Sequence, residues 1–140
     1  MKAQAISRSA LDVEWQRLQV IADNLANANT TRTAEGGVFR PMRLVSGPTT
    51  NFASALRAGN AQLNGVKVYG VEPLAGNVRR VYDPADPHAD ASGFVTYPEI
   101  DRAGEMTLMI QTSRAYEGDL VALNLADQMY SKALELGRQS

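Results

Sequence analysis

Glycine and proline are distributed very unevenly along the chain, and this distribution limits where long helices can form. Residues 34–102 hold eight of the eleven glycines and all six prolines of the 140-residue sequence. Residues 3–28 contain neither, and residues 103–137 contain no proline. Because proline breaks helices and glycine weakens them, the sequence predicts two helical ends and a non-helical insert. The expected organisation is an N-terminal helical part over 1–33, an insert over 34–102 and a C-terminal helical part over 103–140.

The first predicted helix, residues 3–28, has a narrow polar face and a wide apolar circumference. At about 100° per residue, its polar side chains gather on one side: Arg8, Asp12, Gln16, Gln19 and Asp23. Two apolar rows recur at heptad spacing, one with Ile6, Val13 and Val20 and the other with Leu11, Leu18 and Leu25. So wide an apolar surface suits contact with more than one neighbouring helix, although an ordinary core helix of a small bundle has the same pattern.

The second predicted helix, residues 103–137, carries a sustained heptad seam. One row holds Met109, Tyr116, Leu123 and Tyr130, and the other holds Met106, Ser113, Leu120, Asp127 and Leu134. Gly118 weakens the middle of the helix, and Gly137 predicts its end. A helix about 50 Å long cannot be covered on all sides by so short a chain, so we expect other chains to cover it. The fold class expected is mainly α, with two long terminal helices pairing as an antiparallel coiled coil around a small β-rich insert.

Short β-like runs punctuate the insert. Residues 66–71, 78–82 and 94–97 are rich in valine and aromatic residues and are bounded by Gly, Pro, Asn or Asp, which predicts a small sheet of about three strands. Residues 46–65 are small and polar and have little to bury, so we expect a mobile loop there.

The charge balance and the absence of cysteine exclude several classes of function. Fourteen Lys and Arg against fifteen Asp and Glu leave a net charge of -1, without the basic surplus that nucleic-acid binding needs. No cysteine is present, which excludes disulfides and thiolate metal sites. No apolar run suits a signal-peptide core or a membrane span, so we expect neither membrane insertion nor a cleavable signal peptide.

The single histidine, His88, lies in a run that contains Asp83, Asp86 and Asp90. This composition is compatible with a metal site or with a small hydrolase, but the spacing fits neither, and a proline-stiffened acidic turn explains the run better. No phosphate loop, dinucleotide-binding or metalloprotease motif occurs. We therefore expect no enzyme activity, no catalytic residue, no metal ion and no cofactor.

Three asparagines end the first predicted helix. Asn29 fits a frayed helix terminus, because asparagine side chains bond readily to nearby backbone. Asn24 and Asn27 lie one turn apart beside Ile21 and Leu25, where an amide can bond across a helix interface and fix its register. Surface positions near a helix end are the alternative for both residues. The subunit-contact hypothesis predicts that leucine at either position impairs assembly.

Three blocks of sequence carry a family resemblance. The segment from Ala22 to Thr30, Ala-Asp-Asn-Leu-Ala-Asn-Ala-Asn-Thr, resembles the Asn-rich signature near the N-terminus of bacterial flagellar rod and hook subunits. Residues 81–98, with Val-Tyr-Asp-Pro, Pro-His-Ala-Asp and Gly-Phe-Val-Thr-Tyr-Pro, are similar to the middle of a rod subunit of that family, and residues 113–138 are similar to its end. Gly118 departs from the alanine usual there, and residues 46–65 match no pattern.

The resemblance implies a structural subunit of the proximal basal-body rod that polymerises through its terminal helices, transmits torque and lines the export channel. It implies export through the flagellar type III apparatus to a periplasmic rod. The implied partners are other copies of the chain, other rod proteins, and the MS-ring with its adaptor at the rod base. A stand-alone coiled-coil adaptor and another rod subunit of the same axial family remain alternatives.

The expected assembly interface combines the apolar rows and the asparagines. Its residues are Ile6, Leu11, Leu18, Ile21, Asn24, Leu25, Asn27, Met109, Tyr116, Leu120, Leu123, Asn124, Tyr130 and Leu134.

Overall fold

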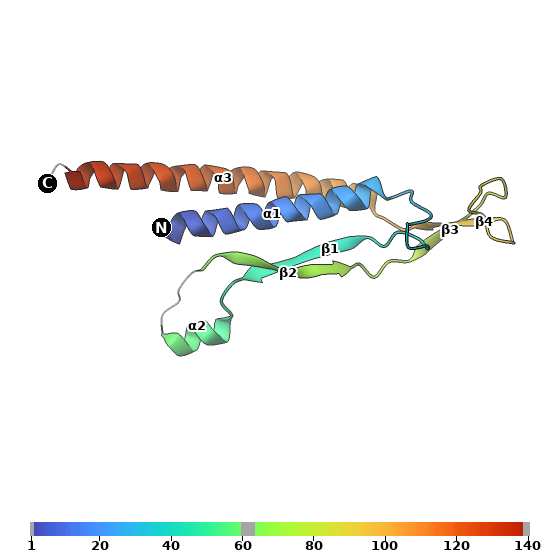
Figure 1. Cartoon of the computed structure of the whole chain (residues 1–140), viewed down its shortest axis with the longest axis horizontal. Helices are drawn as coiled ribbons and strands as arrows, with labels where there is room; N and C mark the ends of the chain where they lie inside the picture. Colours follow the sequence, from blue (N-terminus) through green and yellow to red (C-terminus); the bar gives the residue numbers. More distant parts are fainter. Residues whose placement is uncertain (1, 60–63, 139–140) are drawn as a thin grey trace.

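The computed structural model describes residues 2–59 and 64–138. Its two long helices lie beside one small β-sheet, and a second small β-sheet extends beyond the end of the helices that is opposite the chain termini (Figure 1). In chain order the elements are α1 (Lys2–Ala26), β1 (Met42–Pro48), α2 (Phe52–Ala58), β2 (Val66–Pro73), β3 (Val78–Tyr82), β4 (Phe94–Pro98) and α3 (Arg102–Arg138). The prediction of two long terminal helices around a small β-rich insert is confirmed. Within the described ranges, no helix is long and apolar enough to cross a membrane.

The two long helices lie side by side and run in opposite directions, which brings both chain termini to one end of the molecule (Figure 1). Three side-chain contacts define the register: Asn24 with Glu105, Trp15 with Tyr116, and Gln4 with Asp127. As the residue number falls along α1, the number of its partner on α3 rises. Because α3 has 37 residues and α1 has 25, the last turns of α3 extend past the start of α1.

The hairpin formed by β1 and β2 packs against another side of α1. Three α1 side chains bond to it: Ser9 with the N–H of Val66 (3.1 Å), Arg17 with the hydroxyl of Ser46 (2.8 Å), and Asn24 with the carbonyl of Met42 (2.7 Å). By helical geometry Val13 and Val20 share this side, whereas the leucine row lies toward α3. The wide apolar surface of α1 therefore has two neighbours, but one is a β-hairpin and both belong to the same chain.

The insert forms two separate two-stranded sheets, and the expectation of one sheet of about three strands was wrong. β1 pairs antiparallel with β2, and β3 pairs antiparallel with β4. The three predicted β-like runs lie in β2, β3 and β4. The sequence did not indicate β1, because Gly47 and Pro48 at its end usually interrupt strands.

Regular structure also occupies much of the segment expected to be a loop from 46 to 65. β1 continues to Pro48, and α2 follows after Asn51, whose side chain caps the helix by accepting a hydrogen bond from the Ser54 N–H (2.7 Å). Gly59 ends α2 in the left-handed conformation, with φ of 61°. Residues 60–63 of the expected loop lie outside the described residues.

The buried apolar core is small for a chain of this length. Its members are Val13, Ile21, Ala28, Leu44 and Val95, of which Val95 on β4 is fully buried. Large apolar side chains are exposed along α3 in contrast, including Met129 with 73% of its surface exposed. Much of the apolar surface is therefore not buried within one chain.

The register of α1 against α3 predicts which engineered cysteines form a disulfide. The chain has no native cysteine, so the double variant Gln4→Cys with Asp127→Cys should form an intramolecular disulfide upon mild oxidation. Mass spectrometry of the monomer measures it. In the matched variant Gln4→Cys with Arg114→Cys, the second cysteine is displaced by more than three turns of α3 and should not react. A reversed pattern would contradict the register.

Candidate assembly surface

Asn24 lies at the point where α1, β1 and α3 meet, and only 1% of its surface is exposed. Its Nδ2 donates to the Met42 carbonyl (2.7 Å) and to the Glu105 carboxylate (3.2 Å), and its Oδ1 accepts from the Met42 N–H (2.8 Å). The amide thus bonds the edge of β1 in the way a neighbouring strand does. Both of its polar atoms are used within the chain, so it holds the chain's own elements in register and leaves no group for a subunit contact.

Asn27 and Asn29 complete the end of α1. Asn27 donates from Nδ2 to the Asp23 carbonyl (2.9 Å) and accepts a hydrogen bond from the Thr30 hydroxyl (3.0 Å). Asn29 accepts from Arg102 at the start of α3. These contacts are those of a helix terminus, which is the alternative that the sequence left open.

The structure distributes the predicted interface residues over three environments. Ile21 and Asn24 are buried; Ile6, Leu11, Leu18, Leu25, Asn27, Met109, Tyr116 and Leu123 are half-buried; Leu120, Asn124, Tyr130 and Leu134 are exposed. The half-buried residues include Tyr116, which lies against Trp15 of α1. The residues of this set that remain free for another chain therefore lie on α3.

Further exposed apolar residues of α3 were missing from the predicted set. They are Met106, Leu108, Ile110, Val121, Leu125, Met129 and Leu136, which are between 46% and 73% exposed. Val121, Leu125 and Met129 recur every four residues, so they lie on one side of the helix, outside the two heptad rows. This spacing could have indicated them as interface residues from the sequence. Near the C-terminal end of α3, Leu125, Met129, Ala133 and Leu136 line a shallow, mainly apolar hollow of about 690 Å³.

The face of α1 that remains exposed has the opposite character. Asp12, Gln16, Gln19 and Asp23 are all exposed, as are Arg8 and Ala22 near them. Trp15, which lies beside Tyr116 of α3, is a large apolar side chain of α1 that is 54% exposed. The exposed polar residues form the narrow polar face that the sequence pattern indicated. Polar side chains of this kind are well solvated and gain little from burial against another chain. The candidate assembly surface is therefore the exposed side of α3.

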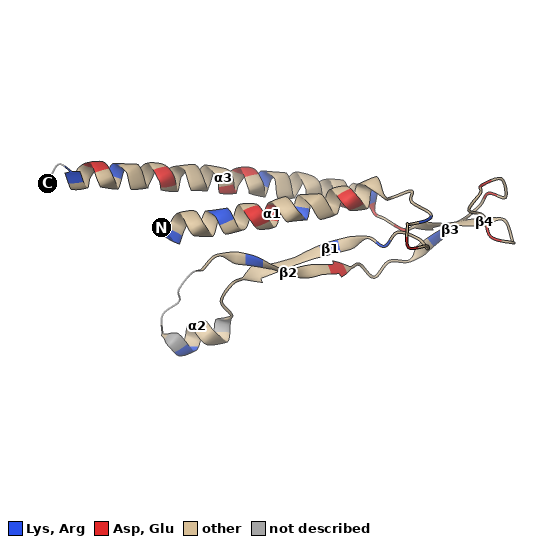
Figure 2. Cartoon of the chain, in the orientation of Figure 1, with Lys and Arg blue, Asp and Glu red and all other residues tan. Residues whose placement is uncertain are grey.

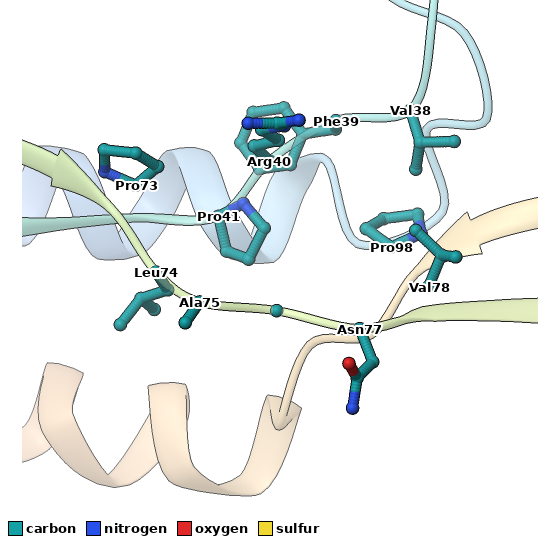
Figure 3. A pocket seen from close by; sticks show the side chains of 11 residues that line it. Val38, Phe39, Arg40, Pro41, Pro73, Leu74, Ala75, Asn77, Val78 and Pro98 are labelled. Atoms are coloured by element: carbon teal, nitrogen blue, oxygen red, sulfur yellow. The ribbon is translucent and has the colours of Figure 1, made fainter.

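A second hollow, of about 480 Å³, lies between the two sheets (Figure 3). Figure 3 shows side chains from the segment before β1, from the link between β2 and β3, and from the end of β4 around it. Pro41, Pro73 and Pro98 contribute to its lining, and Arg40 is the one ionisable residue among the lining residues. A single guanidinium offers no acid–base pair.

His88 is bound into the turn between β3 and β4. Its Nδ1 lies 2.9 Å from the Thr31 hydroxyl, its backbone N–H donates to Asp86 (2.7 Å), and the ring is 3.9 Å from the Asp86 carboxylate. No group of three or more His, Cys, Asp or Glu residues suited to a metal ion occurs in the described part of the chain. These contacts order the turn and connect it, through Thr31, to the segment that follows α1.

Asp90 organises the same turn. Its carboxylate accepts hydrogen bonds from the N–H groups of Phe94 (3.0 Å) and Ser92 (2.9 Å) and from the Arg80 guanidinium. The backbone hydrogen bond from Phe94 is the main cause that holds the pKa of Asp90 below its ordinary value of 3.8; Ser92 and Arg80 act in the same direction. The ionised carboxylate therefore favours the folded turn.

Comparisons with known proteins agree with this arrangement of terminal helices. Residues 5–32 match the family model described as flagella basal body rod protein, and residues 91–136 match that of the flagellar basal body rod FlgEFG protein C-terminal region. The chain is 38% identical to the flagellar basal-body rod protein FlgC of Bacillus subtilis, over 95% of both chains. It is 36% identical to FlgC of Escherichia coli O157:H7, over 95% of this chain and 94% of that one, and 32% identical to FlgC of Borreliella burgdorferi, over 94% and 93%.

Replacement of the two asparagines by leucine should have unequal effects. Asn24→Leu leaves both backbone groups of Met42 and the Glu105 carboxylate without their partner, at about 1–3 kcal/mol per buried group. Asn27→Leu removes contacts at an exposed helix end and should cost under about 1 kcal/mol. Urea unfolding of both variants, monitored by circular dichroism, measures the difference. Equal stability of the two would refute the assignment of Asn24 to the centre of the fold.

Acid should loosen the turn between β3 and β4. Because the folded-state pKa of Asp90 is lowered, its stabilising contribution is present above its unfolded pKa of about 3.9 and is lost as the pH falls through the folded value. The protection of the Phe94 amide against hydrogen exchange, measured relative to the intrinsic exchange rate at each pH, should therefore decrease below about pH 4. Asp90→Asn should show faster exchange at neutral pH and lose this additional pH dependence. An unchanged pH profile in that variant would refute the role of Asp90.

Proposed function

The chain belongs to the FlgC family of flagellar basal-body rod proteins, and from that premise we propose that it is a proximal rod subunit that polymerises through its terminal helices. The family consists of structural rod proteins, so the chain is a structural subunit of the flagellar basal body and not an enzyme. The finer part of the proposal concerns how it assembles, what it contacts and what the assembled rod does.

The observation that carries the proposal is the unequal burial of the two long helices. α1 has its apolar rows against α3 and the β1–β2 hairpin and exposes a polar face. α3 instead exposes large apolar side chains along its whole length, from Met106 to Leu136. Exposed apolar surface of this extent marks an interaction site, because its removal from water favours association.

We infer that in the rod the exposed side of α3 contacts helices of neighbouring subunits as part of an antiparallel coiled coil of terminal helices. Leu120, Tyr130 and Leu134 take part in this contact, together with Val121, Leu125, Met129 and Leu136. Contacts along a helix about 55 Å long would resist twisting of one subunit against the next, which is what transmission of torque requires.

The proposal extends to location and partners. The chain reaches the periplasmic rod through the type III export apparatus, and its helices line the export channel. Its partners are further copies of itself, other rod proteins, and the MS-ring and its adaptor at the rod base. The family assignment favours this function over a stand-alone coiled-coil adaptor.

Two polar substitutions on α3 should separate export from assembly. Leu125→Gln with Met129→Gln preserves side-chain size and helix propensity but removes apolar contacts worth about 1.5–3 kcal/mol for each fully buried side chain. In a non-motile strain of a flagellated bacterium from which the corresponding gene has been deleted, the wild-type chain should restore motility. The double variant should be exported but absent from purified basal bodies, and cells should not swim.

The control for this experiment is Gln16→Ala with Gln19→Ala on the exposed polar face of α1, which should leave motility intact. Full motility with the α3 variant would exclude its exposed side as the assembly surface. Failure of the wild-type chain to enter basal bodies would contradict the proposed function itself.

A further inference from the structure

A small pocket of about 180 Å³ lies where α1, β1 and α3 meet, and Glu105 of α3 forms part of its lining. The rest of the lining is mainly apolar and includes Val20, Ile21, Leu44, Leu74 and Leu108. Leu44 and Glu105 are buried, whereas Leu108 is 46% exposed. The pocket therefore combines apolar walls with a buried carboxylate and borders the surface of the molecule.

Glu105 is a buried carboxylate that forms no ion pair with any residue of 2–59 or 64–138. Only 8% of its surface is exposed, and its carboxylate accepts a hydrogen bond from Asn24 Nδ2 at 3.2 Å. Its position in the first turn of α3 favours the ionised form, because the peptide dipoles at a helix N-terminus stabilise negative charge. A buried charge is costly without a partner of opposite charge, so this carboxylate favours the approach of a cation.

Two arginines also line the pocket, and both are already paired with other carboxylates. Arg17 forms an ion pair with Glu14 at 3.1 Å. Arg43 of β1 forms one with Glu72 of β2 at 3.3 Å, and Figure 2 shows a basic and an acidic residue side by side across this hairpin. The charges within each of these pairs cancel, so the uncompensated charge of the pocket is that of Glu105.

The lining of the pocket restricts the chemistry of a group that can fill it. The carboxylate repels an anion, and a wholly apolar group would bury the charge further without pairing it. A lysine or arginine side chain suits both parts of the lining, because its methylene stem can pack on apolar walls while its charged end bonds a carboxylate. Leu108 is also one of the exposed apolar residues of α3, so the pocket adjoins the candidate assembly surface. A subunit that covers this surface can insert such a side chain.

We propose that the pocket binds a lysine or arginine side chain of a neighbouring rod subunit, whose charged end pairs with Glu105. This inference rests on the proposed function, which makes the neighbour a rod subunit. The contact differs in kind from the apolar contacts of α3, because apolar surface accepts many partners whereas a buried charge rejects those that bring no cation. Glu105 thus contributes to the choice of neighbour as well as to its attachment.

Side-chain analogues test the pocket with the full chain in solution. The probes n-butylammonium and n-propylguanidinium, which correspond to the side chains of lysine and arginine, should shift the methyl NMR signals of Leu44 and Leu108. The control n-butanol has the shape of n-butylammonium without its charge and should bind about tenfold more weakly or less. Glu105→Gln, which retains an acceptor for Asn24, should weaken binding of both cations by a similar factor. Cations that bind no better than n-butanol, or equally well to the variant, would overturn the proposal.

The stability of the Glu105→Gln chain distinguishes a binding role from a structural one. A neutral amide needs no counter-charge, so the isolated variant should unfold at the same urea concentration as the wild type or at a higher one. The matched control is Glu35→Gln, which removes the same charge from an exposed position after α1. A clearly lower midpoint for Glu105→Gln than for this control would mean that the charge is already used within the chain, and it would overturn the proposal.

Incorporation into basal bodies distinguishes the side chain of a subunit from a free amine. In the strain from which the corresponding gene has been deleted, the Glu105→Gln chain should be exported but retained in purified basal bodies in about tenfold lower amount. The Glu35→Gln chain should be retained like the wild type. Normal assembly of Glu105→Gln, with the probes binding as expected, would mean that the pocket takes a free amine and would overturn docking of a neighbour. The wild-type chain would still restore motility in that case, so this failure is distinguishable from failure of the proposed function.

Discussion

The fold depends on the side-chain amide of Asn24. β1 is an edge strand, and the backbone groups of Met42 on its open side point at α1 and have no strand to pair with. Asn24 supplies both a donor and an acceptor to them and reaches Glu105 of α3 as well. A buried backbone group without a partner is costly, so Asn24 joins α1, the hairpin and α3 at the point where they meet. Arg17 and Ser9 extend the same attachment along α1.

Attachment of the hairpin on one side and of α3 on another leaves α1 with a mainly polar exposed face, beside which Trp15 is an exposed large apolar side chain. α3 is longer than α1 and has no hairpin on its far side, so its apolar residues remain exposed. The asymmetry between the two helices follows from the connection of the chain: the insert that follows α1 folds back onto α1. The demand for partners is thereby concentrated on α3.

Particular elements show how far sequence reasoning reached. The long helices and the strands β2, β3 and β4 were predicted, because periodicity and local propensity are properties of the residues themselves. β1 was missed, because its ending in Gly47 and Pro48 is tolerable only on an edge whose outer side is bound by α1. The predicted interface included Ile21 and Asn24, which lie buried within the chain, and omitted Leu125 and Met129, which do not. An apolar position looks the same in sequence whether its own chain or another covers it.

The sequence by itself determined the helical ends, the β-rich insert and the resemblance to flagellar rod subunits. These follow from the placement of glycine and proline, from heptad spacing and from short ordered motifs, which are all local along the chain. Only the tertiary structure decided that Asn24 bonds within the chain, that the insert packs on α1, and that α3 has the free apolar surface. Those outcomes depend on which segments distant in sequence come into contact. The free energy of such contacts comes from apolar surface that two segments bury together and from hydrogen bonds between them, so it cannot be read from either segment alone.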